Sequence, residues 1–186
     1  MNVKNDIKRV TEVDVSPEIR IYNLLKSYPY DLGSALSEYI DNSLQSFLSN
    51  KDKLDKKKLT VKIRLDYSNI NNNKIIIEDD GMGINNQDLK RAMKPAFRPE
   101  EQNLNEFGIG MKAASIWIGR KWTLSNNYLF RENKNETEQI IFDLDKLIQD
   151  EQSKIPVKIV ENKAANHGVT ITIEELNREF NLYQIQ

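Results

Sequence analysis

A helical spacing of apolar residues marks the segment from Ser34 to Leu48. The stripe predicted to pack this helix on a core contains Leu36, Ile40, Leu44, Phe47 and Leu48. Asp31 or Ser34 can cap the start of the helix, because either side chain can accept a hydrogen bond from a free backbone amide. The pattern therefore predicts an amphipathic helix with one buried side.

The other side of this helix carries a carboxylate and two carboxamides, from Glu38, Asn42 and Gln45. Their i, i+4 and i+7 spacing puts all three side chains on one face. Taken alone, the segment favours an ordinary solvated face. A functional face requires further chemical groups from elsewhere in the chain, and later segments supply them.

Two strands are predicted after the connector KDKLDKKK at 51–58, for which a solvated loop is favoured over a phosphate-binding patch. Alternating apolar residues from Leu59 to Leu65 predict a half-buried strand. The run KIIIE at 74–78 predicts a more buried strand, and the asparagine-rich turn before it predicts a hairpin.

The remaining pattern predicts short helices near 17–27, 87–93, 111–118 and 144–150, and strands near 121–126, 128–132, 139–143, 156–161 and 169–174. Residues 95–105 lack periodicity and have the length of a lid or binding loop. Helices dominate the first two thirds of the chain and hairpin-linked strands the rest. We expect an α+β fold, a two-layer sandwich with helices over one face of a mixed, mainly antiparallel sheet.

Composition narrows the chemistry. A chain of 186 residues with 39% hydrophobic residues suits one domain, and a net charge of -1 creates no global attraction for nucleic acid or anionic membrane. There is no cysteine and a single histidine, His167, which excludes thiolate sites and argues against histidine triads. The start resembles no signal peptide and no apolar run could span a bilayer, so we expect a cytoplasmic protein without a membrane partner.

Two glycine motifs offer binding chemistry. Asp79-Asp80-Gly81-Met82-Gly83 follows the buried strand and can place a carboxylate at the floor of a pocket, where it suits an exocyclic amine. Gly108-Ile109-Gly110 precedes a predicted helix, whose free amides can hold an anion such as phosphate, with Lys112 in the first turn. Each motif alone also occurs in ordinary turns.

The order of these motifs is more specific than any one of them. The chain carries Glu38-Tyr-Ile-Asp-Asn42 on a helix, then the aspartate and glycine turn, then a lid-length loop, then Phe107-Gly-Ile-Gly110-Met-Lys112. Over residues 30–176 it resembles the GHKL superfamily of ATP-binding domains, the Bergerat fold of gyrase B subunits, ninety-kilodalton heat-shock chaperones, MutL proteins, sensor histidine kinases and MORC ATPases. The motif style is most similar to the MORC and chaperone forms.

The resemblance implies a nucleotide site. Asp79 would bind the adenine amine, with Gly83 and Ile84 lining the base pocket. Asn42 would be a magnesium ligand between the protein and the phosphates, and Ser46 would also contact the nucleotide. The residues implied to wrap the phosphates are Phe107, Gly108, Ile109, Gly110, Met111 and Lys112. The implied ligands are ATP or ADP and Mg²⁺.

The resemblance also makes Glu38 the general base that activates water, so the chain would be an ATP hydrolase. Histidine kinases lack this glutamate, which favours hydrolysis over phosphoryl transfer to histidine. The alternative is a module that retains the fold and binds nucleotide or protein without turnover. Two positions depart from the family pattern. Gln45 replaces an aspartate, and Val169 takes the position of a threonine. This register would move Thr170 to the other face of the strand, and Thr170 is kept as a candidate for the adenine site.

We expect residues 1–30 to form an arm and helix of the same domain, 31–176 the ATP-binding core, and 177–186 a tail or a linker to a further domain. Family members often hydrolyse ATP only as closed dimers with a second domain, so we expect slow or undetectable turnover by this chain alone. The implied partners are an ATP-dependent second copy and a further domain or protein. DNA enters only by kinship with MutL and MORC proteins.

Overall fold

The computed structural model describes residues 19–68, 72–93, 110–152, 154–162 and 166–180. Its sheet has the strand order β1-β2-β6-β3-β4-β5, and every pairing among these strands is antiparallel. The strands are β1 (Val61–Asp66), β2 (Lys74–Asp79), β3 (Gly119–Asn127), β4 (Glu136–Asp143), β5 (Val157–Glu161) and β6 (Gly168–Leu176). The expected sheet is confirmed, but the described strands contain no parallel pair.

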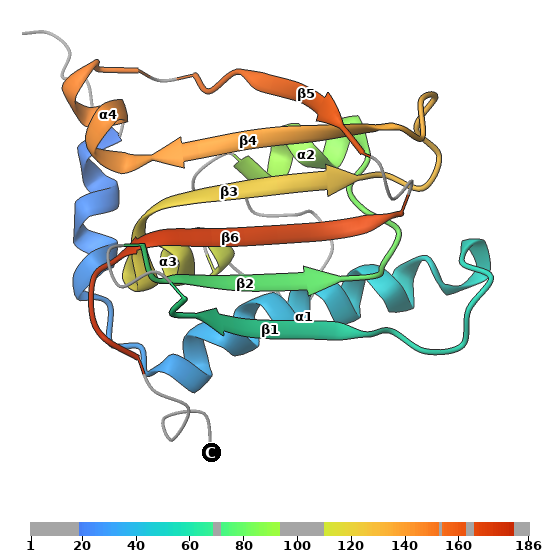
Figure 1. Ribbon diagram of the computed structural model, residues 1–186, viewed down its shortest axis with the longest axis horizontal. Coiled ribbons are helices and arrows are strands. Elements are labelled where there is room, and N and C mark those ends of the chain that lie inside the picture. Colours follow the sequence, from blue (N-terminus) through green and yellow to red (C-terminus); the bar gives the residue numbers. More distant parts are fainter. Residues whose placement is uncertain (1–18, 69–71, 94–109, 153, 163–165, 181–186) are drawn as a thin grey trace, which may run out of the picture.

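The helices gather on one face of this sheet (Figure 1). They are the 3₁₀ helices η1 (Ile19–Ser27) and η2 (Lys51–Lys53), and the α-helices α1 (Leu32–Ser49), α2 (Asn86–Met93), α3 (Gly110–Ile118) and α4 (Leu144–Gln149). α1, α2 and α3 lie behind the sheet in this view, and the opposite face is left open. The fold is therefore the expected α+β sandwich of two layers.

The core forms where alternate strand residues meet α3. Ile75, Ile173 and Trp122 are fully buried, with 0% of each exposed. In each of their strands, the residue two positions away is also buried, as expected for side chains that alternate between the two faces. Lys112 and the six residues that follow it in α3 are all buried, because this helix packs against both α1 and the sheet. α3 is thus the central helix of the domain.

The buried face of α1 differs from the predicted one. Ile40, Leu44 and Leu48 are 41%, 39% and 57% exposed. Leu36 and Phe47 of the predicted stripe are buried, as expected, and α1 also buries Leu32, Ala35, Tyr39 and Ser43. Tyr39 and Ser43 can face inward because their hydroxyl groups have partners, at Ser115 and Asp79. The helix is therefore rotated so that polar groups reach the interior.

Other differences from the predicted elements are local. Residues 128–132 form the connection between β3 and β4 and not a strand, and the helix near 17–27 is a 3₁₀ helix where it is described. The remaining predicted helices and strands lie within a few residues of the observed ones. Among the described helices, none combines the length and the apolar character needed to cross a lipid bilayer.

Candidate functional site

The three motifs meet along one side of α1. The Ser43 hydroxyl group donates a hydrogen bond of 3.1 Å to Oδ2 of Asp79, which ends β2. Five residues earlier on the helix, Oε2 of Glu38 lies so close to Gly110 that an added Cβ atom there would be 2.0 Å away. Asn42 is half-buried on α1 between these two contacts. Five residues of α1, a rise of about 7.5 Å, therefore separate Ser43, which contacts Asp79, from Glu38, which contacts Gly110.

Asp79 is the most enclosed carboxylate of this site. It lies on the helix side of the sheet and accepts hydrogen bonds from the Gly81 amide at 2.8 Å and the Val169 amide at 3.3 Å, in addition to that from Ser43. Burial raises the pKa of Asp79, and these donors act in the opposite direction. The carboxylate is thus fixed in orientation by donors from α1, the turn after β2 and β6.

Glycine is required at two positions around the aspartate motif, where backbone segments approach each other closely. Gly168 has φ +123°, and a Cβ atom there would lie 2.0 Å from the Asp79 carbonyl oxygen. Gly83 has φ +73°, and its Cβ atom would lie 2.5 Å from the Asn127 carbonyl oxygen. An L-residue at either position combines backbone strain with a backbone clash. The second glycine of the aspartate motif therefore serves close packing against β3.

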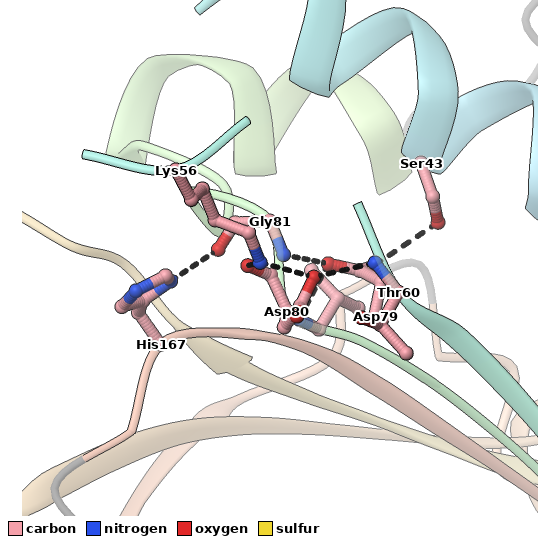
Figure 2. A network of polar contacts seen from close by, with 8 residues as sticks. Ser43, Lys56, Thr60, Asp79, Asp80, Gly81 and His167 are labelled. Atoms are coloured by element: carbon pink, nitrogen blue, oxygen red, sulfur yellow. Dashed lines mark hydrogen bonds and ion pairs between the residues drawn. The ribbon is translucent and has the colours of Figure 1, made fainter. Parts of the chain in front are cut away.

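Asp80 points away from Asp79 and fixes the turn to the connector before β1 (Figure 2). Its Oδ1 atom lies 2.5 Å from Lys56 Nζ and accepts the Thr60 amide at 2.8 Å. Burial acts to raise the pKa of Asp80, but the bonds from Lys56 and Thr60 outweigh it and lower the pKa. The connector expected to be a solvated loop therefore has one anchored lysine.

His167 holds the same turn from the side of β6 (Figure 2). Its Nδ1 atom lies 2.6 Å from the Gly81 carbonyl oxygen. Because a carbonyl oxygen can only accept a hydrogen bond, Nδ1 must carry the proton. The one histidine of the chain thus contributes to the shape of the aspartate motif.

Asn126 contacts the site although it stands in none of the sequence motifs. Its side chain is 0% exposed. Oδ1 of Asn126 accepts a hydrogen bond of 2.8 Å from the Ile84 backbone amide, and Nδ2 donates one of 2.7 Å to the Ile84 carbonyl oxygen. Asn126 also donates to Glu138 at 2.8 Å. A sequence signal existed, because Asn126 continues the inward alternation of Trp122 and Leu124. A polar residue at such a position needs a buried partner.

Tyr30 is a second missed residue. Its hydroxyl group donates a hydrogen bond of 2.9 Å to Oε1 of Glu38. Burial, and then this hydrogen bond, raise the pKa of Tyr30. Neither Tyr30 nor Ser43 stands in a motif that predicts its partner, since each contact joins residues that only the folded chain brings together.

Lys112 is placed in the first turn of α3, as expected, but its side chain is only 3% exposed. Its Nζ atom donates a hydrogen bond of 2.6 Å to the carbonyl oxygen of Ala92, in the last turn of α2. Burial lowers the pKa of Lys112 to about 8. In this structure the ammonium group therefore binds the carboxyl end of α2, a favourable place for a cation.

Of the remaining predicted site residues, two lie in described helices and three lie outside the described part of the chain. Met111 is half-buried in α3, and Ser46 is half-buried on α1, one turn beyond Asn42. Phe107, Gly108 and Ile109 lie outside the described residues.

The structure corrects the expectation for Thr170. Thr170 pairs directly with Glu78, so the two side chains share a face of the sheet, and Asp79 points to the other face. Thr170 therefore lies on the open face of the sheet. Val169 is the β6 residue that reaches Asp79, through its backbone amide.

A cavity of about 350 Å³ lies elsewhere, at the end of β2 and β6 far from Asp79. Its lining includes Tyr67, Asn73, Leu176 and Arg178. Because Asn73 precedes β2 and Asp79 ends it, the cavity is separated from the motifs by the length of the strand. It does not belong to the site on α1.

The site offers the enclosed acceptor Asp79, the half-buried start of α3 at Gly110 and the half-buried carboxylate of Glu38. No group of three or more acidic, histidine or cysteine side chains that could hold a metal occurs in the described ranges. A magnesium ion at Asn42 would therefore take most of its ligands from phosphate and water, as that ion commonly does. The donor set fits a nucleotide that brings its own metal.

Comparison with known proteins agrees with this geometry. A search of curated proteins returned no match to the chain. A family model described as histidine kinase-, DNA gyrase B- and HSP90-like ATPase matches residues 30–177, which is most of the chain. The chain therefore belongs to this family of ATPases.

Proposed function

We propose that the chain binds ATP with Mg²⁺ and hydrolyses it by attack of water on the terminal phosphate. The observation that carries this proposal is the meeting of Glu38, Asp79 and Gly110 along one side of α1. In this proposal Asp79 would recognise the base, and the start of α3 would receive an anion. Glu38, beside that start, would act on water next to the anion.

Asp79 would accept a hydrogen bond from the adenine amine. Its carboxylate is already oriented by Ser43, Gly81 and Val169, so little order has to be gained on binding. Ile84, whose backbone is fixed by Asn126, would line the base pocket together with Gly83.

Asn42 would supply a carboxamide oxygen to Mg²⁺, which neutralises charge on the phosphates when it is bound. Glu38 would accept the proton of the attacking water, a task for which reach matters more than an extreme pKa. The free amides at the start of α3 would hold the phosphates. Lys112 would have to leave Ala92 before it could contact the same phosphates.

The alternative function is a module that binds nucleotide without hydrolysis. Gln45 and Val169 depart from the patterns of hydrolysing relatives, which supports this alternative, whereas the position of Glu38 favours hydrolysis. We further propose that nucleotide binding drives a conformational or dimerisation switch, and that turnover by this chain alone is slow. DNA binding rests on kinship alone and forms no part of the proposal.

Calorimetric titration with ATP and ADP in the presence of Mg²⁺ tests the proposal. We expect binding that Asp79→Asn or Asn42→Ala abolishes. Glu38→Ala should retain binding and lose single-turnover hydrolysis. Absence of binding by the wild-type chain at millimolar nucleotide would rule out both functions. Binding with no hydrolysis in the wild-type chain would favour the module without turnover.

A further inference from the structure

Tyr30 lies outside the motifs that define the site, yet its hydroxyl group is 2.9 Å from Oε1 of Glu38. It is separated from α1 only by Asp31, the residue that caps this helix through the Ser34 amide. The phenol therefore extends from the start of the helix to the carboxylate two turns later. The other carboxylate oxygen, Oε2, is the atom that lies against Gly110.

We infer that Tyr30 is a positioning residue for hydrolysis, whose hydroxyl group holds one oxygen of Glu38 so that the other faces the start of α3. The inference rests on the proposed function, because it assigns Tyr30 a role in the action of Glu38 on water. It concerns the direction of the carboxylate and not nucleotide binding. Tyr30 itself is not assigned a contact with the substrate.

The ring of Tyr30 is fixed from two sides, as such a role requires. Its centroid lies 4.8 Å from that of Tyr28, and 6.1 Å from that of Trp117 in an edge-on arrangement. Trp117 is 4% exposed and is covered in turn by the Arg178 guanidinium group, 3.9 Å from the ring centroid. A ring held in this way presents its hydroxyl group in one place.

Glu38 needs such a partner because a free glutamate side chain samples many rotamers. A carboxylate with one oxygen bonded and the other against Gly110 is restricted to a narrow range of orientations. Misplacement of a catalytic group by about 1 Å can cost about a hundredfold in rate. The raised pKa of Tyr30 also means that its hydroxyl group remains a donor throughout the neutral range.

The test compares Tyr30→Phe with Tyr28→Phe in the whole chain. Each variant removes one hydroxyl group and keeps the ring. Of these two hydroxyl groups, it is that of Tyr30 that donates a hydrogen bond to Glu38 in the part of the chain that the structure describes. We expect Tyr30→Phe to lower the single-turnover rate constant by roughly tenfold. The dissociation constant for ADP should change by less than about twofold, because Tyr30 is not assigned a contact with the nucleotide. Tyr28→Phe should leave both quantities unchanged.

A second readout separates a positioning role from a purely structural one. A carboxylate that loses a hydrogen-bond donor is protonated more easily. The acid limb of the pH–rate profile should therefore move to higher pH in Tyr30→Phe and remain in place in Tyr28→Phe.

The outcomes distinguish this inference from the proposed function. A wild-type chain that hydrolyses ATP at the same rate and with the same pH profile as Tyr30→Phe overturns the inference alone. A wild-type chain that binds no ATP, or binds it without any single-turnover hydrolysis, overturns the proposed function and the role of Tyr30 with it.

Discussion

The two ends of the site are held by very different numbers of contacts. At the base end, Asp79 accepts three hydrogen bonds, and the turn that follows is fixed through Asp80, Gly81 and Ile84. At the phosphate end, among the described residues, Glu38 is held by Tyr30. The comparison indicates that the proposed base end is held in place by several contacts before any ligand binds. Among the described residues, the proposed phosphate end relies on single contacts, each of which a substitution can remove.

The largest expected effect is on stability at the base end. Gly168→Ala places a Cβ atom 2.0 Å from the Asp79 carbonyl oxygen at φ +123°. The backbone of β6 must shift, so we expect a loss of about 4 kcal/mol or more in the free energy of unfolding. Chemical denaturation measures this change, and nucleotide binding should be lost with it.

Gly33→Ala is the matched control for that substitution. Gly33 lies in the first turn of α1, where an added Cβ atom would be 3.3 Å from Oδ1 of Asp31, a side chain that can adjust. We expect a change within about 1 kcal/mol. Equal effects of the two substitutions would show that the base end is not especially intolerant.

The next effect concerns Lys112 and depends on pH. The pKa of Lys112 is about 8 in the folded chain and 10.5 for an ordinary lysine side chain, so between these values the unfolded chain binds more protons. Stability should therefore rise with pH across this window, by up to about 3 kcal/mol in total. Lys112→Met should be more stable than the wild-type chain at pH 7 and should lose this advantage as pH approaches 10.5.

Denaturant titrations of both proteins at several pH values measure the difference. Lys74→Met offers a control, because Lys74 is only partly buried and lies beside Asp66 at 3.6 Å. An advantage of Lys112→Met that stayed constant from pH 7 to 10.5 would contradict the assignment of a buried, charged amine.

A third substitution should damage the chemistry while largely sparing the fold. Gly110→Ala brings a Cβ atom within 2.0 Å of Oε2 of Glu38. The Glu38 side chain can swing away, so we expect a loss of only about 1 kcal/mol in stability. Single-turnover hydrolysis should fall about a hundredfold, equivalent to about 2.7 kcal/mol in the barrier. A large loss of stability with unchanged hydrolysis would reverse the comparison between the two ends.

The smallest effect is expected at the rim of the base end. His167→Phe keeps a ring but removes the donor to the Gly81 carbonyl oxygen. One lost hydrogen bond should cost about 1 kcal/mol in the free energy of unfolding. Thermal melting and ADP titration measure the effect, and a complete loss of ADP binding would mean that His167 does more than fix the turn.

Much of the fold could be predicted from the sequence because its signals are local. The alternation in β2 and the glycines before α3 depend on neighbouring residues in the chain, and both elements were placed within a few residues. The order of the motifs then indicated the family. What local patterns could not give was the partner of each polar side chain.

The rotation of α1 shows why. Ile40 and Leu44 look like core residues by type, whereas Tyr39 and Ser43 do not. The burial of Tyr39 and Ser43 depends on their partners Ser115 and Asp79, which lie 76 and 36 residues further along the chain. The same holds for Tyr30 and Asn126, whose partners become evident only when α1 and β3 are in place. Thr170 differs from these residues, because alternation along the strand already put its side chain on the other face, and its pairing with Glu78 agrees.

The position of β6 has a consequence for how the chain folds. This strand comes last among those described, yet it lies between β2 and β3 and joins the first hairpin to the rest of the sheet. Pairing of β2 with β6 must close a loop of more than ninety residues, which slows folding. Because the same strand supplies the Val169 amide to Asp79, competence to bind a base would arise only at this late step. A nascent chain released before β6 emerges would present two unpaired strand edges and an incomplete base site.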